Sequence, residues 1–311
     1  MISNEATKRM ESMPVYDRNI PETCEIHYRT QTDWKLVEVL AIYFGGVGTG
    51  LYILSQIFGY TAGMIVGYLL VIVLKNIAHL FASSKPFRSI RVLSQPRTSW
   101  ISRGSYGIFL FAVLGLLDIV IRLGLVRFDS AVFPAIVSVL AAIAAFIIMA
   151  YIGFVFTEAR NIDFWHSSIV PVMFISHSVA MGYALLIILY ALLQTQTDFY
   201  KFAWQFLISL GAAALMVYTF MSVMRHISKS ADEAVRILLH GKLAMMFWVG
   251  AIFAGLLVPI CLTGYCYLTG SPAACSGLTL SIAGILTLLG ALLFQLCFVR
   301  AGVSTPIVSV D

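Results

Sequence analysis

Eight stretches of this sequence are apolar over the length that a helix needs to cross a lipid bilayer. The hydrocarbon core of a bilayer is about 30 Å thick, which takes about 20 residues of helix to span. Because a helix satisfies its own backbone hydrogen bonds in lipid, the sequence predicts eight transmembrane helices. Their predicted bounds are Leu36 to Phe58, Thr61 to Ser83, Gly104 to Val126, Ala131 to Phe156, Ile169 to Leu193, Phe202 to Met224, Leu243 to Leu268 and Leu278 to Val299.

The composition excludes a soluble protein. The chain is 60% hydrophobic and only 11% charged, whereas soluble domains carry about 25% charged residues to solvate their surface. We therefore expect an all-α polytopic membrane protein with eight transmembrane helices in two four-helix bundles. This class excludes a nucleic-acid-binding domain, a secreted disulfide scaffold and a soluble enzyme.

Polar segments divide the chain into four predicted parts. Residues 1–35 form a polar N-terminal tail, and residues 36–156 form the first four-helix bundle. Residues 157–299 form the second bundle, and residues 300–311 form a C-terminal tail. The links after the second, fourth and sixth helices are the longer, polar ones. Most of the extramembrane chain is therefore expected on the side of the N-terminus.

The basic residues are distributed unevenly between the two sides of the membrane. Of the 20 lysines and arginines, Lys75 and Arg122 lie inside predicted helices, and Arg127 and Lys201 lie in links on the far side. All the others lie on the N-terminal side. Cytoplasmic links carry an excess of Lys and Arg, so the count predicts an inner (cytoplasmic) membrane protein with both termini in the cytoplasm.

Four ionisable residues lie within predicted helices, where each costs at least about 2.5–3.5 kcal/mol to insert. They are Glu38, Lys75, Asp118 and Arg122. Asp118 and Arg122 are four residues apart on one helix face, where they can neutralise each other. Lys75 and His79 have the same spacing, but two potential cations need an acceptor from another helix or from a ligand. Lys75 and His79 are therefore candidate ligand-binding residues.

Glu38 begins the first helix and precedes a glycine-rich run, GGVGTG. The carboxylate has two interpretations: an interfacial residue that reaches the headgroups, or a proton acceptor at the mouth of a cavity between helices. The glycines lie inside an apolar span, so they do not form a phosphate loop. Gly46 and Gly50 have the small-xxx-small spacing that lets another helix approach closely.

Histidine and cysteine positions bear on cofactors and compartment. Bundle cytochromes need axial histidines in facing pairs, and only His177 lies deep in a span, so neither haem nor a metal is expected in this chain. Five cysteines are present without a CxxC pair. We expect buried structural thiols, with a Cys266–Cys275 disulfide near one membrane surface as the alternative.

Four segments in register with the helices resemble the polysulfide reductase membrane-subunit family, also called NrfD-like. They are YFGGVGTGLYIL (43–54), KPFRSIRVLSQPRTSWISRG (85–104), NIDFWHSSIVPVMF (161–174) and FWVGAIFAGLLVP (247–259), and the ending VRAG is also similar. The resemblance covers about residues 36 to 302. It implies a subunit without its own redox cofactor that binds quinol or quinone, such as menaquinone, in its first four-helix half.

The resemblance also implies partners and site residues. The partners are an iron–sulfur ferredoxin-like electron-transfer subunit and a molybdopterin-type catalytic subunit. Aligning the helix 1 glycines places Glu38 at a quinone-side asparagine and Ala41 at a neighbouring histidine, so Glu38 is the expected proton acceptor. Aligning Trp165 places Tyr151 at a quinone-side tyrosine. Glu38 and Tyr151 are thus the expected catalytic residues, with Lys75 and His79 as further quinone-binding residues.

The basic link between the second and third helices is a candidate docking surface. Arg88, Arg91, Arg97 and Arg103 would face either anionic headgroups or an acidic partner. In the best-known relatives this surface faces an extracytoplasmic partner, whereas the charge count places it in the cytoplasm. Both orientations are left open by the sequence.

Two other functions are compatible with the sequence. Intramembrane charges and helix-breaking Gly and Pro are also typical of a secondary transporter of a small solute or ion, although no inverted repeat is evident. A scaffold that only anchors a catalytic subunit would leave Glu38 and Tyr151 without a role.

Overall fold

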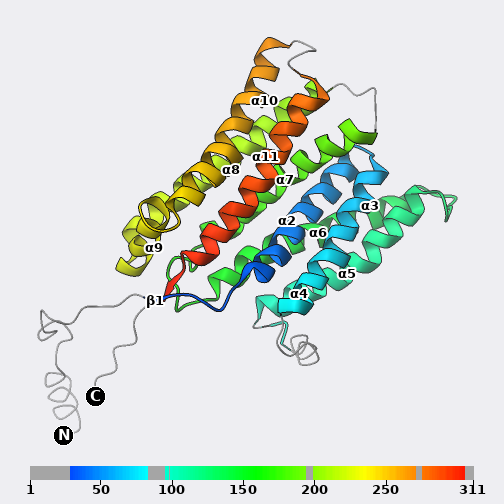
Figure 1. Ribbon diagram of the computed structural model, residues 1–311. Coiled ribbons are helices and arrows are strands. Elements are labelled where there is room, and N and C mark those ends of the chain that lie inside the picture. The colour runs from blue at the N-terminus through cyan, green and yellow to red at the C-terminus, as the bar shows by residue number, and fades with distance from the viewer. Residues whose placement is uncertain (1–28, 83–94, 98, 194–198, 271–274, 305–311) are drawn as a thin grey trace, which may run out of the picture.

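The computed structural model describes residues 29–82, 95–97, 99–193, 199–270 and 275–304. Within these ranges, eight helices are long and apolar enough to cross a membrane. They run up and down side by side, and both ends of the described chain, at Arg29 and Ser304, lie at the same end of the bundle (Figure 1). The prediction of an all-α membrane protein with eight spans is confirmed.

Six spans are single helices and two contain a π-helical stretch. The single helices are α2 (Leu36–Ile57), α5 (Trp100–Arg122), α6 (Val132–Thr157), α7 (Ile169–Leu193), α8 (Tyr200–Ile227) and α11 (Gly277–Arg300). The second span consists of α3 (Thr61–Leu69), the π-helix η1 (Leu70–Lys75) and α4 (Asn76–Ala82). The seventh consists of the π-helix η3 (Met246–Leu257) and α10 (Val258–Thr269). A short helix, α9 (Lys229–Leu239), follows the sixth span.

The predicted bounds agree with these helices within three residues except at the third span, which begins and ends four residues earlier than expected. Ser99 starts α5 because its side chain accepts a hydrogen bond from the Ser102 N–H, as an N-cap residue does. At the other end, Gly124 has a positive φ of 71°, which turns the chain out of the helix. The helix therefore includes the segment from Trp100 to Arg103, which precedes the apolar run.

Close approach between α2 and α7 depends on glycine. A Cβ atom on Gly50 would overlap the backbone carbonyl of Ser178, and one on Gly182 would overlap Gly50. The small-residue interpretation of the glycine-rich run is thereby confirmed, with α7 as the helix that approaches. Because the core cluster includes Phe156 and Phe298, it extends across both halves of the chain. The division into two four-helix bundles stays a prediction.

The two ends of the described chain are joined in a small sheet. Strand β1 (Arg29–Thr30) pairs antiparallel with β2 (Val303–Ser304). The Gln31 side chain donates to the Val299 carbonyl oxygen over 3.0 Å. This pairing holds Trp34 against the bundle end, where its ring lies 5.0 Å from that of Phe156.

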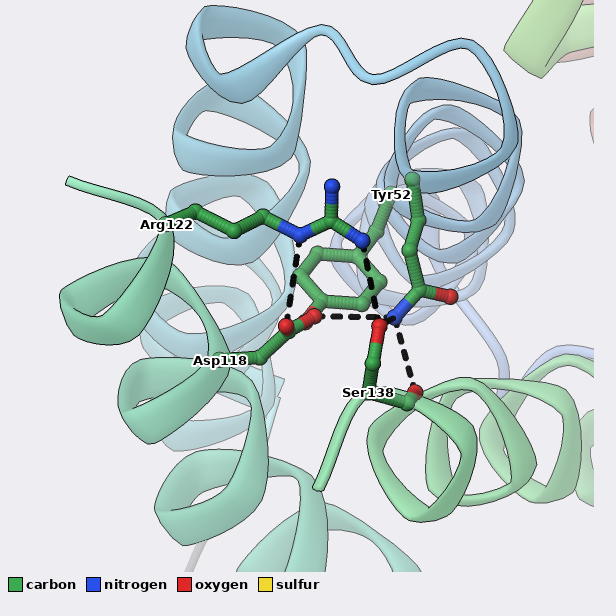
Figure 2. Close-up of polar contacts among 5 residues, drawn as sticks. Tyr52, Asp118, Arg122 and Ser138 are labelled. Atoms are coloured by element: carbon green, nitrogen blue, oxygen red, sulfur yellow. Dashed lines mark hydrogen bonds and ion pairs between the residues drawn. The ribbon is translucent and has the colours of Figure 1, made fainter. Parts of the chain in front are cut away.

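A polar network ties α2, α5 and α6 together at the end away from the termini (Figure 2). Arg122 Nε lies 3.3 Å from Asp118 Oδ1, which confirms the predicted pair. The other carboxylate oxygen accepts from Tyr52 Oη and Gln56 Nε2, each at 2.8 Å. Arg122 and Gln56 also donate to Ser138 Oγ. Asp118 is thus a cross-helix junction rather than only half of an ion pair.

We expect Asp118→Ala to destabilise the fold, because it leaves Tyr52, Gln56 and Arg122 without their shared acceptor. Leaving a buried donor unsatisfied costs about 1–3 kcal/mol, so thermal unfolding in detergent should begin several degrees lower. Asp129→Asn is the matched control, since Asp129 is exposed in the link after α5. Equal melting of Asp118→Ala and wild type would show that the network contributes nothing to stability.

The cysteines follow the alternative rather than the expected pattern. Cys266 and Cys275 form a disulfide at the end opposite the termini, so the prediction of free thiols is wrong for these two. Cys261 and Cys297 are free. The positions where α10 ends and α11 begins bring the two sulfurs together, which spacing alone does not determine.

Candidate functional site

A pocket of about 430 Å³ lies inside the terminus-bearing end of the first four spans. Volumes of about 300–1,000 Å³ are typical of small-molecule sites. Each of the four spans contributes to its wall, and Trp34 adds a residue from the segment before α2. Most of the lining is apolar; the polar side chains are Glu38, Asn76, His79, Ser105 and Tyr151.

Glu38 is held at the start of α2 by the helix itself. Its Oε2 accepts a hydrogen bond from the Lys35 N–H at 2.8 Å, so the carboxylate caps the first turn. The side chain is half-buried and lines the pocket. The carboxylate therefore caps the helix and also faces the cavity, whereas proton acceptance by Glu38 stays a prediction.

Tyr151 enters the pocket from α6. Its side chain is buried, and its hydroxyl makes no hydrogen bond with another described residue. Gly104 on α5 makes room for the ring, because a Cβ atom there would lie within the space of the Tyr151 ring. Gly104 was not predicted as a site residue, although it closes the 85–104 segment that carries the family resemblance.

Lys75 lies behind Tyr151 rather than on the pocket wall. Its ammonium nitrogen is 5.5 Å from the centroid of the Tyr151 ring, within the range of a cation–π contact. The residue is fully buried, and Nζ has no hydrogen-bond partner among the described residues. Because an unpaired polar group in a membrane is costly, Lys75 stays a candidate functional residue.

His79 and Asn76 form the side of the pocket made by α4. Both follow the π-helical turn η1, a feature that is frequent at functional sites. The Asn76 side chain donates to the Ile72 carbonyl oxygen at 2.8 Å. On the facing helix, Ile101 lines the pocket and is 46% exposed. The pocket therefore reaches the outer surface of the bundle between α4 and α5, where lipid would be.

The four arginines predicted to form the docking surface differ in their position and contacts. Arg88 and Arg91 lie outside the described residues. Arg97 is exposed. The Arg103 guanidinium donates to the carbonyl oxygens of Pro96 and Arg97, at 2.9 and 2.7 Å. Arg103 therefore also orders the chain that leads into α5.

The arrangement can bind a lipid-soluble molecule with a polar head. A phenol and an imidazole can donate or accept hydrogen bonds, and a carboxylate at the mouth can accept a proton. No group of three or more His, Cys, Asp or Glu side chains comes together as metal ligands would among the described residues. Hydrogen bonding and proton transfer are reactions that the pocket's own side chains can supply.

The fold and pocket define a class: a multi-pass helical membrane protein with an internal, mainly apolar site near one surface. A family model described as polysulphide reductase, NrfD, matches residues 25–306. The chain belongs to this family, as the sequence resemblance predicted. A comparison with curated proteins gave no match.

Proposed function

We propose that this chain is the quinone-reactive membrane anchor of a multisubunit oxidoreductase. It exchanges electrons between the quinone pool, with menaquinone as the expected member, and a docked iron–sulfur subunit that serves a molybdopterin enzyme. The observation that carries the proposal is the shared pocket. Glu38, His79 and Tyr151, chosen from sequence, come from three different spans and line one cavity.

Quinol oxidation requires the removal of two electrons and two protons from the headgroup. In the proposed mechanism, the headgroup enters between α4 and α5, and the Tyr151 hydroxyl donates a hydrogen bond to one of its oxygens. The Glu38 carboxylate accepts the two protons one after the other and passes each to the adjacent surface. The electrons leave to the iron–sulfur partner. Lys75, beneath the Tyr151 ring, favours negative charge on the headgroup as its proton leaves.

Binding of a quinone can be tested on the purified chain, because Trp34 lines the pocket. We expect a menaquinone analogue to quench tryptophan fluorescence in a saturable manner. Trp34→Phe should reduce this quenching, whereas Trp248→Phe, which lies on η3, should leave it intact. Quenching that is unchanged in Trp34→Phe but reduced in Trp248→Phe would place the quinone elsewhere and contradict the proposal.

The basic link before α5 is the proposed docking surface for the electron-transfer partner. We expect the double variant Arg91→Glu with Arg97→Glu to release the partner, because like charges oppose an acidic face. The partner should co-purify with wild type and with Arg127→Glu, whose arginine is exposed at the opposite end. Retention of the partner by the double variant at moderate salt would refute this surface.

The disulfide supports the orientation expected from charge. Disulfides persist in oxidising compartments and are rare in the cytoplasm. Since Cys266–Cys275 lies opposite the termini, we expect a fluorescent protein fused to the C-terminus to fold in the cytoplasm. An alkaline phosphatase fused there should be inactive for lack of export. Active phosphatase would reverse the proposed orientation and place the docking surface outside.

A further inference from the structure

A second hollow, distinct from the proposed quinone site, runs along the outside of the sixth and seventh spans. It has a volume of about 390 Å³ and lies between α8, η3 and the end of α9. Its α8 face is formed by Ala214, Val217, Tyr218, Met221, Ser222 and Arg225. These positions recur every three or four residues, so they form one continuous stripe along the helix. We call this hollow the α8 groove.

The length of the groove matches the hydrocarbon depth of one membrane leaflet. From residue 214 to residue 225, α8 rises about 16 Å at about 1.5 Å per residue. Half of a hydrocarbon core about 30 Å thick is about 15 Å. The deep end, at Ala214 and Leu257, is apolar, and Arg225 lies in the last turn of α8. An acyl chain placed in the groove would thus end with its headgroup at Arg225.

The shallow end of the groove presents donors and positive charge. Arg225 and His240 both line it and are exposed, and no ion pair joins either to an acidic side chain among the described residues. The nearby Glu233 pairs instead with Arg236, at 3.5 Å. Residues 225–242 contain four lysines and arginines against two carboxylates. The local charge therefore favours an anionic headgroup.

The α8 groove also has the features of a membrane interface. Trp248, 48% exposed, lines the groove and donates its indole N–H to the Leu239 carbonyl oxygen at 3.1 Å. Tryptophan is enriched at the headgroup level of a bilayer. Helix α9 packs its apolar face, which includes Ala234 and Leu238, into the protein core and leaves Lys229 exposed. The groove thus opens where headgroups lie.

We infer that the α8 groove is a binding site for an anionic phospholipid of the leaflet next to the termini. One acyl chain lies along the stripe of α8 against Trp248 and Ile252 of η3. The headgroup phosphate accepts hydrogen bonds from Arg225 and His240. Basic pockets between transmembrane helices bind anionic headgroups in this way.

Native mass spectrometry of the detergent-purified chain tests this site. We expect palmitoyl-oleoyl phosphatidylglycerol to be retained at about tenfold lower concentration than the phosphatidylcholine of the same chains. Arg225→Gln with His240→Gln should abolish this preference. Arg160→Gln with Lys229→Gln removes two exposed cations on the same side, outside the groove, and should keep it.

A variant that fills the groove separates chain binding from headgroup attraction. Ala214→Phe should weaken retention of both lipids while leaving the preference for phosphatidylglycerol unchanged. Equal retention of the two lipids by wild type would overturn the inference. So would a preference that survives in Arg225→Gln with His240→Gln, or displacement of phosphatidylglycerol by an equal concentration of a long-tailed quinone, which would assign the groove to quinone.

Discussion

Glu38→Gln should slow quinol oxidation by about 100-fold or more in the complex purified with its native partner. A positioned acid or base contributes about 10²–10⁴ to the rate, and glutamine cannot accept the proton. The amide oxygen can still accept the hydrogen bond from the Lys35 N–H that caps α2. Folding should therefore survive, and quinone binding should change less than turnover.

Comparison with Tyr151→Phe separates the effect of Glu38→Gln on turnover from an effect on quinone binding. That variant loses only a hydroxyl, so quinone binding should weaken roughly two- to tenfold, as expected for a net hydrogen bond of about 0.5–1.5 kcal/mol. Asp129→Asn, an exposed carboxylate at the other end, should behave as wild type. The activity of the partner enzyme with an artificial dye should be unchanged in all three. A wild-type rate of quinol oxidation by Glu38→Gln would remove Glu38 from the mechanism.

Gly104→Ala should abolish most quinone binding although residue 104 is not expected to touch the quinone. The added methyl group occupies the space of the Tyr151 ring, which must then move into the pocket or away from Lys75. Either movement removes the phenol from its position. We expect the tryptophan quenching by a menaquinone analogue to fall at least about tenfold in affinity, which corresponds to about 1.4 kcal/mol.

Gly211→Ala is the matched control for this substitution. Gly211 also lies within a membrane-spanning helix, but a Cβ atom there meets nothing within 4 Å. In a Tyr151→Ala background, adding Gly104→Ala should cause little further loss of binding, because the ring that the methyl group displaces is gone. If Gly104→Ala alone binds quinone as wild type does, Tyr151 is not positioned by this contact.

The sequence predicted the spans well because the bilayer imposes a strong pattern. A helix in lipid must be apolar over its whole length, and seven of the eight predictions agree with the structure within three residues. The exception, α5, begins in a polar segment that hydropathy alone does not include. The short helix α9 and the β1–β2 pair were not predicted, since neither is an apolar run and the strands are distant in sequence.

The site was only partly predictable. An ionisable residue in an apolar helix costs free energy to insert into the membrane, so the sequence alone indicates it as a candidate site residue. Tyr151 was predicted from the family resemblance. The sequence does not show how deep in the bundle a side chain lies or which way it points. Lys75 was therefore placed among the pocket residues, although it lies behind Tyr151. Trp34 was assigned to a polar tail. Its position depends on the pairing of β1 with β2, which only the folded chain brings together.

Photoaffinity labelling of the purified complex with an azido-menaquinone tests the central claim most directly. We expect the labelled peptides, located by mass spectrometry, to contain residues 34–42, 76–82, 101–108 or 151–156, the four segments that contribute to the pocket lining. Excess menaquinone should prevent the labelling, and Gly104→Ala should reduce it. Labelling confined to other segments, such as the α8 groove, or labelling that excess menaquinone does not prevent, would contradict a quinone site between the first four spans.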